Sequence, residues 1–270
     1  FFKSRLLVSP SVRTELAVNN SSDQSLSTDY NISGKLGTEW NIINNLKMSG
    51  HVSRSYRLPN FYELFGDRGT FIGNPQLENE SSTNFDIGLI YPHKFQNVKI
   101  NTSLVYFENR ISNLIQMQQT SQLTVRAANI GKATIRGVEL SANLDFWKRL
   151  NLSGNYSFQD ARDRSNRQGI SGRFLPGRPR HEANISTKAY NRWADIFLQI
   201  SWMDANFLDS QNILKVSNRT LLNMGSSMKF KKNSLIISFE AKNLTNNRIV
   251  DVVGFPLPGR SYHGKLTVKI

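Results

Sequence analysis

Two polar stretches of the sequence carry side chains that could hold an anionic or aromatic ligand. Residues 57–73 and 162–180 are rich in arginine and, in the first stretch, in phenylalanine and tyrosine. Guanidinium groups bind anions through charge-assisted hydrogen bonds, and aromatic rings stack on flat ligands. We therefore hypothesise a ligand-binding site that comprises Arg57, Phe61, Tyr62, Phe65, Arg68, Phe71, Arg162, Arg164, Arg167 and Arg173.

Catalytic and metal-binding patterns are not apparent elsewhere. Cysteine is absent, and His51, His93, His181 and His263 fall on different segments with no carboxylate at ligand spacing. Nucleophile-elbow, phosphate-loop and dinucleotide-binding motifs are missing. The carboxylates of residues 63–80 share one polar loop, where such groups are usually solvated. We therefore expect no enzyme activity, no metal site and no cofactor.

The chain has 34 Lys and Arg and 20 Asp and Glu, and its net charge of +14 could indicate nucleic-acid binding. These charges are scattered singly, without a basic helix, a zinc-finger spacing or an RNA-binding aromatic motif to organise them. We therefore expect no nucleic-acid partner.

The segments between the loops alternate between apolar and polar residues with the period of two that β-strands have. In residues 261–270, for example, Leu266 and Val268 share one face, while Lys265 and Lys269 share the other. Twelve such stripes, each about ten residues long, cover the chain. No apolar run approaches the roughly 18–20 residues of a membrane-spanning helix.

The connections between these stripes alternate between short and long. Short turns are expected near residues 44–45, 92–93, 148–149, 191 and 231–233. Long loops are expected over residues 19–29, 57–80, 119–125, 162–179, 207–216 and 247–258. An antiparallel up-and-down meander of this kind is typical of outer-membrane β-barrels, which have short turns at one end and long loops at the other.

A soluble β-sandwich or barrel would also alternate, but its strands are usually only about five or six residues long. Aromatic residues cluster near the short turns, as in the girdles of membrane barrels: Trp40, Tyr91, Phe146, Trp147, Tyr190, Trp193 and Phe230. The apolar stripes are almost free of charge, and a lysine or arginine facing lipid at the midplane costs about 2–4 kcal/mol. We therefore predict an all-β, antiparallel transmembrane barrel.

Three stretches resemble the C-terminal barrel of TonB-dependent outer-membrane receptors. The first is RSYRLPNFYELF at residues 54–65, followed by GNPQLENE at residues 73–80. The second is NIGKATIRGVEL at residues 129–140, and the third is NLTN at residues 243–246 with GFPLPGR at residues 254–260. Their order and spacing extend over nearly the whole chain, although Asn79 replaces the family's usual proline.

The resemblance implies a 22-stranded barrel with an N-terminal plug in its lumen. Residues 1–270 would form the C-terminal portion of that barrel, with the plug, about ten strands and the TonB-contacting segment upstream of Phe1. The chain opens without a methionine or a leader segment, which fits this expectation.

The resemblance also implies the outer membrane of a Gram-negative-type bacterium and energy-coupled uptake of a scarce nutrient. A ferric siderophore is the leading expected ligand, and cobalamin is the second. The expected partners are the TonB energy-transducing complex acting through the plug, outer-membrane lipid and lipopolysaccharide, and the small-molecule ligand.

Alternative functions remain open on the sequence alone. A passive porin or an adhesin-type barrel would have the same strands without energised transport, and a soluble β-rich binding module would lack the membrane altogether. Arg57 and Phe61 would brace their own loop, and the arginines of residues 162–180 would face lipopolysaccharide, if neither group touches a ligand.

Overall fold

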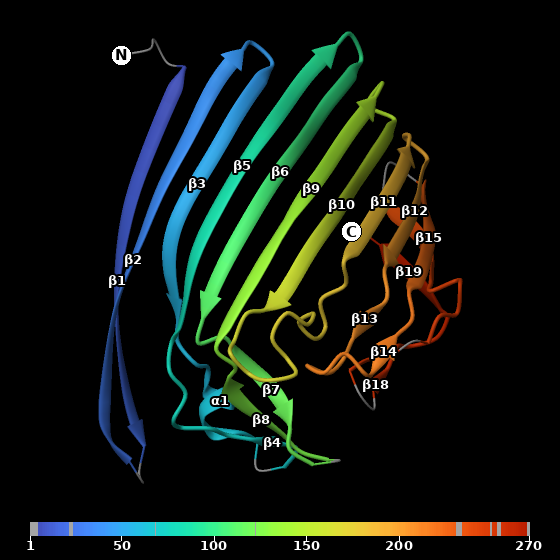
Figure 1. The fold of residues 1–270 in the computed structure, drawn as a ribbon. Helices are drawn as coiled ribbons and strands as arrows, with labels where there is room; N and C mark the ends of the chain where they lie inside the picture. The colour runs from blue at the N-terminus through green and yellow to red at the C-terminus, as the bar shows by residue number, and fades with distance from the viewer. Residues whose placement is uncertain are drawn as a thin grey trace.

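The chain forms one curved antiparallel sheet of twelve strands, in the order β1-β2-β3-β5-β6-β9-β10-β11-β12-β15-β16-β19 (Figure 1). The computed structural model describes residues 5–21, 24–67, 69–121, 123–230, 234–248, 250–252 and 255–268. Each strand pairs with the next strand of this order. The predicted all-β up-and-down fold is confirmed, and so is the predicted number of long strands.

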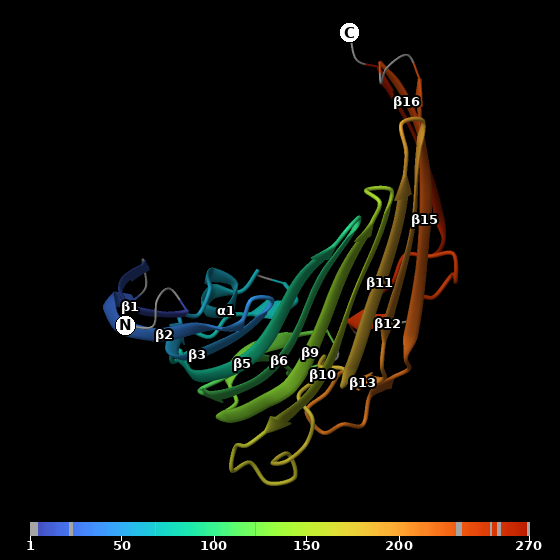
Figure 2. The same ribbon diagram turned by 90° about the horizontal axis from the view of Figure 1, so that it is seen from above.

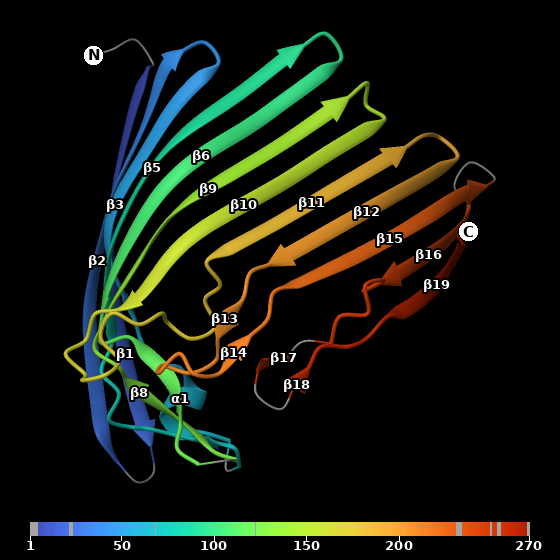
Figure 3. The same ribbon diagram turned by 45° about the vertical axis from the view of Figure 1, so that its right-hand side comes forward.

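The strands of the main sheet are β1 (Leu6–Ser21), β2 (Gln24–Ile43), β3 (Leu46–Arg57), β5 (Glu80–Phe95), β6 (Val98–Ser112), β9 (Lys132–Phe146), β10 (Leu150–Asp163), β11 (His181–Tyr190), β12 (Ala194–Met203), β15 (Arg219–Phe230), β16 (Leu235–Lys242) and β19 (Ser261–Val268). Tight turns join them at one end of the sheet, and longer connections join most of them at the other, with β1 and β2 as the exception (Figure 3). Several strands exceed the roughly 9–11 residues that a tilted strand needs to cross a bilayer, so they extend beyond it at the long-loop end.

The long connections contain short elements of their own: α1 (Phe61–Phe65), β4 (Phe71–Ile72), β7 (Ile115–Gln119), β8 (Val125–Asn129), β13 (Asn206–Phe207), β14 (Lys215–Val216), β17 (Val250–Val252) and β18 (Phe255–Pro256). Strands β4, β8 and β7 form a separate small sheet in which β4 runs parallel to β8. Among the residues described, no helix is long and apolar enough to cross a membrane.

One face of the main sheet is apolar and exposed. The register places Leu140 of β9 between Leu104 of β6 and Tyr156 of β10. The leucines keep 48% of their surface exposed, and no large side chain in the described part of the chain is fully buried. These apolar stripes therefore do not pack into a closed interior. This is the arrangement of a barrel whose outer face touches hydrocarbon.

The opposite face is polar and concave. The hydroxyl groups of Ser103 and Ser141 lie 2.7 Å apart across β6 and β9, and the Asn151 amide donates to Asn143 and Asp145. Helix α1 lies on the concave side, as seen in Figure 2. Because side chains alternate along each strand, the same residues that fix the apolar face also fix this polar one.

Some predicted boundaries were wrong. Strand β1 ends at Ser21 and β2 begins at Gln24, so the long loop predicted over residues 19–29 does not exist. The ladder there includes the pair Asn19 and Ser27, since backbone hydrogen bonds outside the bilayer need no apolar side chains. The turn predicted near residues 92–93 falls instead at 96–97, after the end of β5.

Other boundaries differ less. The loop predicted over residues 119–125 is the tip of a longer connection that β7 and β8 occupy. Tyr190, grouped with the interfacial aromatics, lines a groove on the polar face beside Lys99 and Asp145. The turn predicted at residues 231–233 lies outside the described residues.

The two faces predict opposite effects of a new charge. Leu140 lies about midway along the part of β9 that spans the bilayer, so Leu140→Lys is expected to lower the unfolding free energy of the complete receptor in lipid vesicles by about 2–4 kcal/mol. The control is Ser141→Lys, one residue along the same strand and on the polar face. Urea titration followed by tryptophan fluorescence would measure both. Equal losses in the two variants would contradict the assignment of the faces.

Candidate functional site

The long-loop end of β3 is held by an ionic hub at Arg57. Its guanidinium donates to Glu80 at 2.7 Å through Nη2 and to Glu63 at 2.9 Å through Nη1. Both carboxylates are largely shielded from solvent, whereas Arg57 is 42% exposed. The hub therefore joins the end of β3, the start of β5 and helix α1 into one unit.

Arg57 lies at the twelfth residue of β3, beyond the roughly 9–11 residues of the membrane span. Its hydrogen bond to Glu80 raises the pKa of the guanidinium above its ordinary value, against the lowering effect of burial and with further help from Glu63. Glu63 also accepts from the backbone of Asn60, whose side chain in turn accepts from the Glu63 amide. This capping box starts the five-residue helix α1.

Helix α1 presents an aromatic surface to solvent. Phe61 and Tyr62 are 71% and 62% exposed, and the rings of Phe61 and Phe65 meet at 4.9 Å. Phe71 is also exposed, and its carbonyl accepts from the backbone of Asp67. The predicted residue Arg68 lies outside the described part of the chain. Exposed aromatic rings next to a braced loop are suited to stacking on a ligand.

Two glycines allow the loop after α1 to fold back against the end of that helix. Gly66 has φ of +72°, and a Cβ at Gly73 would lie 2.4 Å from the carbonyl carbon of Phe65. A larger residue at either position would force the backbones apart, because only glycine tolerates both the left-handed conformation and this approach.

A second brace joins this loop to the next one. The Asn129 side chain accepts from the Glu78 backbone at 2.9 Å and donates to the carbonyls of Glu78 and Asn113. Nearby, the Asn74 amide donates to the Ala127 carbonyl. The first two motif stretches noticed in the sequence therefore meet in space, and their polar residues hold the loops together.

The third motif stretch performs the same task between β16 and β19. The buried Asn243 side chain donates to the carbonyls of Asn247 and Pro258. Arg260 donates to the Leu244 carbonyl through its guanidinium. Sequence reasoning assigned no role to these residues individually, and their place in the motifs was the only signal available.

The arginines of the loop between β10 and β11 are mostly engaged. Arg162 binds Asp160 at 2.8 Å and lies 3.8 Å from the centre of the Phe174 ring. Arg167 binds Asp163 at 2.8 Å. Both therefore brace their own loop, which leaves fewer groups for a ligand than their number suggests.

Of the other two predicted arginines of this loop, Arg173 is also engaged and Arg164 is not. Arg173 donates to the carbonyls of Gly169 and Gln211, and so links this loop to the one between β12 and β15. Arg164 is exposed, and within the described residues its side chain has no hydrogen bond, ion pair or ring contact. No contact among the described residues joins this arginine group to the aromatic residues of α1.

Asp163 is almost fully buried at the end of β10, beyond the membrane span. Burial alone would raise the pKa of its carboxyl group. Hydrogen bonds from Ser165 and the ion pair with Arg167 outweigh that effect and leave the pKa below its usual range. The ionised carboxylate is therefore part of the structure of the 164–180 loop.

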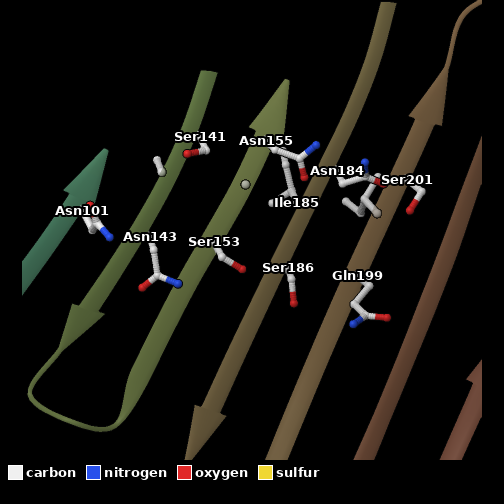
Figure 4. A pocket seen from close by; sticks show the side chains of 13 residues that line it. Asn101, Ser141, Asn143, Ser153, Asn155, Asn184, Ile185, Ser186, Gln199 and Ser201 are labelled. Carbon is white, nitrogen blue, oxygen red and sulfur yellow. The ribbon is translucent and has the colours of Figure 1, made fainter. Parts of the chain in front are cut away.

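The concave face below the loops is lined by uncharged polar groups, which sequence reasoning did not single out as a site. A hollow of about 480 Å³ lies over β9, β10, β11 and β12 (Figure 4). Its polar lining comprises Asn101, Ser141, Asn143, Ser153, Asn155, Asn184, Ser186, Gln199 and Ser201. Amide and hydroxyl groups bind water and neutral polar groups without selecting a charge. Among the described residues, no cluster of three or more His, Cys, Asp or Glu could hold a metal ion.

The open sheet with its apolar outer face, polar concave face and braced long loops defines an outer-membrane β-barrel of the receptor class. The chain belongs to the TonB-dependent receptor family, since the family model "TonB dependent receptor-like, beta-barrel" matches residues 2–244. It is a protein of the outer membrane of a Gram-negative bacterium. The resemblance noted in the three motif stretches is confirmed.

Individual relatives and structures agree with this assignment. The chain is 24% identical to the vitamin B12 transporter BtuB of Photobacterium profundum over 92% of its own length and 39% of that protein. It is 26% identical to an iron-regulated outer membrane virulence protein of Vibrio cholerae over 58% of its length and 27% of that protein. The chain thus spans well under half of these relatives.

Solved structures share the fold at low sequence identity. The copper transporter OprC superposes with a TM-score of 0.76 at 14% identity over 98% of this chain and 45% of that one. The siderophore receptor PiuA of Acinetobacter baumannii gives 0.73 at 16% identity over 97% of this chain and 40% of that one. These relatives are transporters and receptors, and none is described as an enzyme.

Loss of the Arg57 hub should loosen the loop without disturbing the sheet. Arg57→Gln is expected to cost the 58–79 loop about 1–2 kcal/mol, because charged hydrogen bonds contribute about 1.5–3 kcal/mol and partial exposure reduces that value. Hydrogen exchange of residues 58–79 would measure the opening. The control, Arg54→Gln, removes an arginine that bonds to the Tyr56 hydroxyl on the outward face. Equal protection in both variants would show that the hub does not hold the loop.

The low pKa of Asp163 predicts an acid-sensitive loop. A carboxylate whose folded pKa lies below the ordinary value of about 3.9 stabilises the fold above that pH, and the contribution disappears as pH falls through the folded pKa. Pepsin should therefore cut within residues 164–180 of the complete receptor much faster at pH 2 than at pH 5. Asp163→Asn should be cut rapidly at both. Residues 113–131 contain no carboxylate and serve as the internal control. A cutting rate that is the same for both proteins at pH 5 would refute this role.

Proposed function

We propose that this chain is the C-terminal portion of a 22-stranded, plugged barrel that imports a scarce nutrient with energy supplied through TonB. The family match over residues 2–244 is the observation that carries the proposal. In the described residues, β1 and β19 each pair on one side only. Open strand edges are not tolerated in hydrocarbon, so further strands are needed to close the ring. The plug and its TonB-contacting segment would lie in the remaining part of the receptor.

The ligand we favour is a ferric siderophore, with cobalamin as the second candidate. Support comes from relatives named as a vitamin B12 transporter and a siderophore receptor, and from the net charge of +14. The aromatic surface of α1 and the unengaged Arg164 would make the first contacts, by stacking and by charge-assisted bonding. Arg57, Arg162, Arg167 and Arg173 would act mainly by holding these loops in position.

The alternative is a passive porin or adhesin-type barrel. Uptake of ferric enterobactin and of cyanocobalamin by cells that depend on the complete receptor distinguishes the two. We expect uptake of one of these ligands to stop when a protonophore collapses the inner-membrane proton gradient, and to stop in cells that lack TonB. The control is diffusion of a small sugar through an unrelated porin in the same cells. Uptake that continues after both treatments would favour the passive barrel.

The aromatic surface can be tested separately. Replacing Phe61 and Tyr62 with alanine should weaken ligand binding about 5- to 100-fold, since each lost aromatic contact is worth about 0.5–1.5 kcal/mol. Receptor abundance in the membrane should not change, because both rings are exposed. Phe95→Ala removes an exposed aromatic ring at the opposite end of the sheet and serves as the matched control. Unchanged affinity for the imported ligand would remove α1 from the binding site.

A further inference from the structure

The outward face of the sheet changes character at its long-loop end. On β9 and β10 the lipid-facing pair is Val138 and Phe158, and the next outward pair toward the loops is Arg136 and Asp160. Tyr106 of β6 pairs with Val138 and lies beside them. An apolar surface thus borders directly on charged groups, at the height where a membrane meets its headgroups.

Three guanidinium groups gather at this border. Arg162 bonds to Asp160 at 2.8 Å, and its guanidinium covers the Phe174 ring at 3.8 Å. Arg180 lies 5.4 Å from the centre of the Phe174 ring and 5.6 Å from that of Phe158. The rings hold the two guanidinium planes in place before any ligand arrives, which reduces the entropy lost on binding.

The cluster has more positive than negative charge. Asp160 contacts Arg162, and its second oxygen lies 3.8 Å from Arg136. A second acid, Glu108 of β6, stands opposite Arg136 in the register, accepts from the Tyr106 hydroxyl and forms an ion pair with Arg110 at 2.6 Å. Four arginines, with Arg110 included, against the two carboxylates Asp160 and Glu108 leave a surplus of two positive charges. Within the described residues Arg180 contacts rings and no carboxylate. A hollow of about 420 Å³ lies among these groups; its lining is Tyr106, Arg136, Gly137, Val138, Phe158, Asp160, Arg162 and Arg180.

We propose that this hollow binds a phosphate group of a phosphorylated glycolipid in the outer leaflet, with the acyl chains lying along the apolar stripe below. Arginine suits phosphate because its planar fork donates two parallel hydrogen bonds. The adjoining Val138 and Phe158 side chains suit the hydrocarbon part of the same molecule. An imported ligand would pass along the concave face, on the other side of the sheet, so it does not compete for this hollow.

The inference depends on the outward register and the outer-membrane location, and not on which nutrient is imported. Uptake experiments could therefore fail while this site remains valid. The site also gives Arg162 a place on the lipid side of the barrel, whereas Arg164 and the aromatic surface of α1 remain candidates for the imported ligand.

The test uses the complete receptor, purified and freed of lipid in detergent. Native mass spectrometry would measure its affinity for bisphosphorylated lipid A and for the same lipid after removal of both phosphates. The double variant Arg136→Gln with Arg180→Gln should bind the bisphosphorylated lipid about tenfold or more weakly, since each lost charged hydrogen bond is worth at least a tenfold change. Its affinity for the dephosphorylated lipid should match that of the unmodified receptor.

The matched control is Arg192→Gln, which removes an arginine stacked 4.2 Å above the Trp193 ring at the opposite end of the sheet. Arg192→Gln should leave lipid A binding unchanged. If the double variant fails to fold, Arg180→Gln alone replaces it, because within the described residues the Arg180 side chain contacts only the two aromatic rings. Equal affinity of variant and unmodified receptor for the bisphosphorylated lipid would overturn the proposal. Inorganic phosphate that bound the receptor as tightly as the bisphosphorylated lipid would also overturn it, because that result would indicate a site for free anions.

Discussion

In hydrocarbon, a backbone N–H or C=O group without a partner costs several kcal/mol, and this constraint dominates the structure. The chain meets it with long, uninterrupted ladders. Strands β5 and β6 pair without a break from Phe95 and Val98 to Ser81 and Ser112, and β9 continues the same register. Tight turns keep neighbouring strands in phase at one end, so the loops can vary freely only at the other.

Strand pairing also fixes what each face can do. Because side chains alternate, Leu140 meets lipid while its neighbour Ser141 reaches the concave face. The outer face is apolar across the bilayer and becomes cationic near the loops, at Arg136. The inner face stays largely neutral and polar over the hollow of Figure 4. The two-residue alternation of side chains along each strand therefore separates an apolar outer surface from a polar concave one.

The long loops are organised by charge pairing more than by apolar packing. Arg57 joins two carboxylates, Asn129 joins two loops, and Arg162 and Arg167 each bind a neighbouring aspartate. A small apolar cluster around Ile130, shared by the ends of β9 and β10, supports them from the concave side. Most basic residues that looked available for a ligand are thus committed to structure. Among the predicted ligand contacts that the structure describes, the exposed aromatic rings of α1, Phe71 and Arg164 remain.

The sequence alone determined the strand period, the number of long strands, the apolar face and the family, since all of these depend on residues close together in the chain. It placed the loop ends less well, as with residues 19–29, because a polar strand outside the bilayer has no hydrophobic signal. Only the tertiary structure decided which arginines are free. Glu80 lies 23 residues from Arg57, and Asn129 lies 51 residues from Glu78. Such pairings depend on strand register and loop folding, which local sequence does not encode.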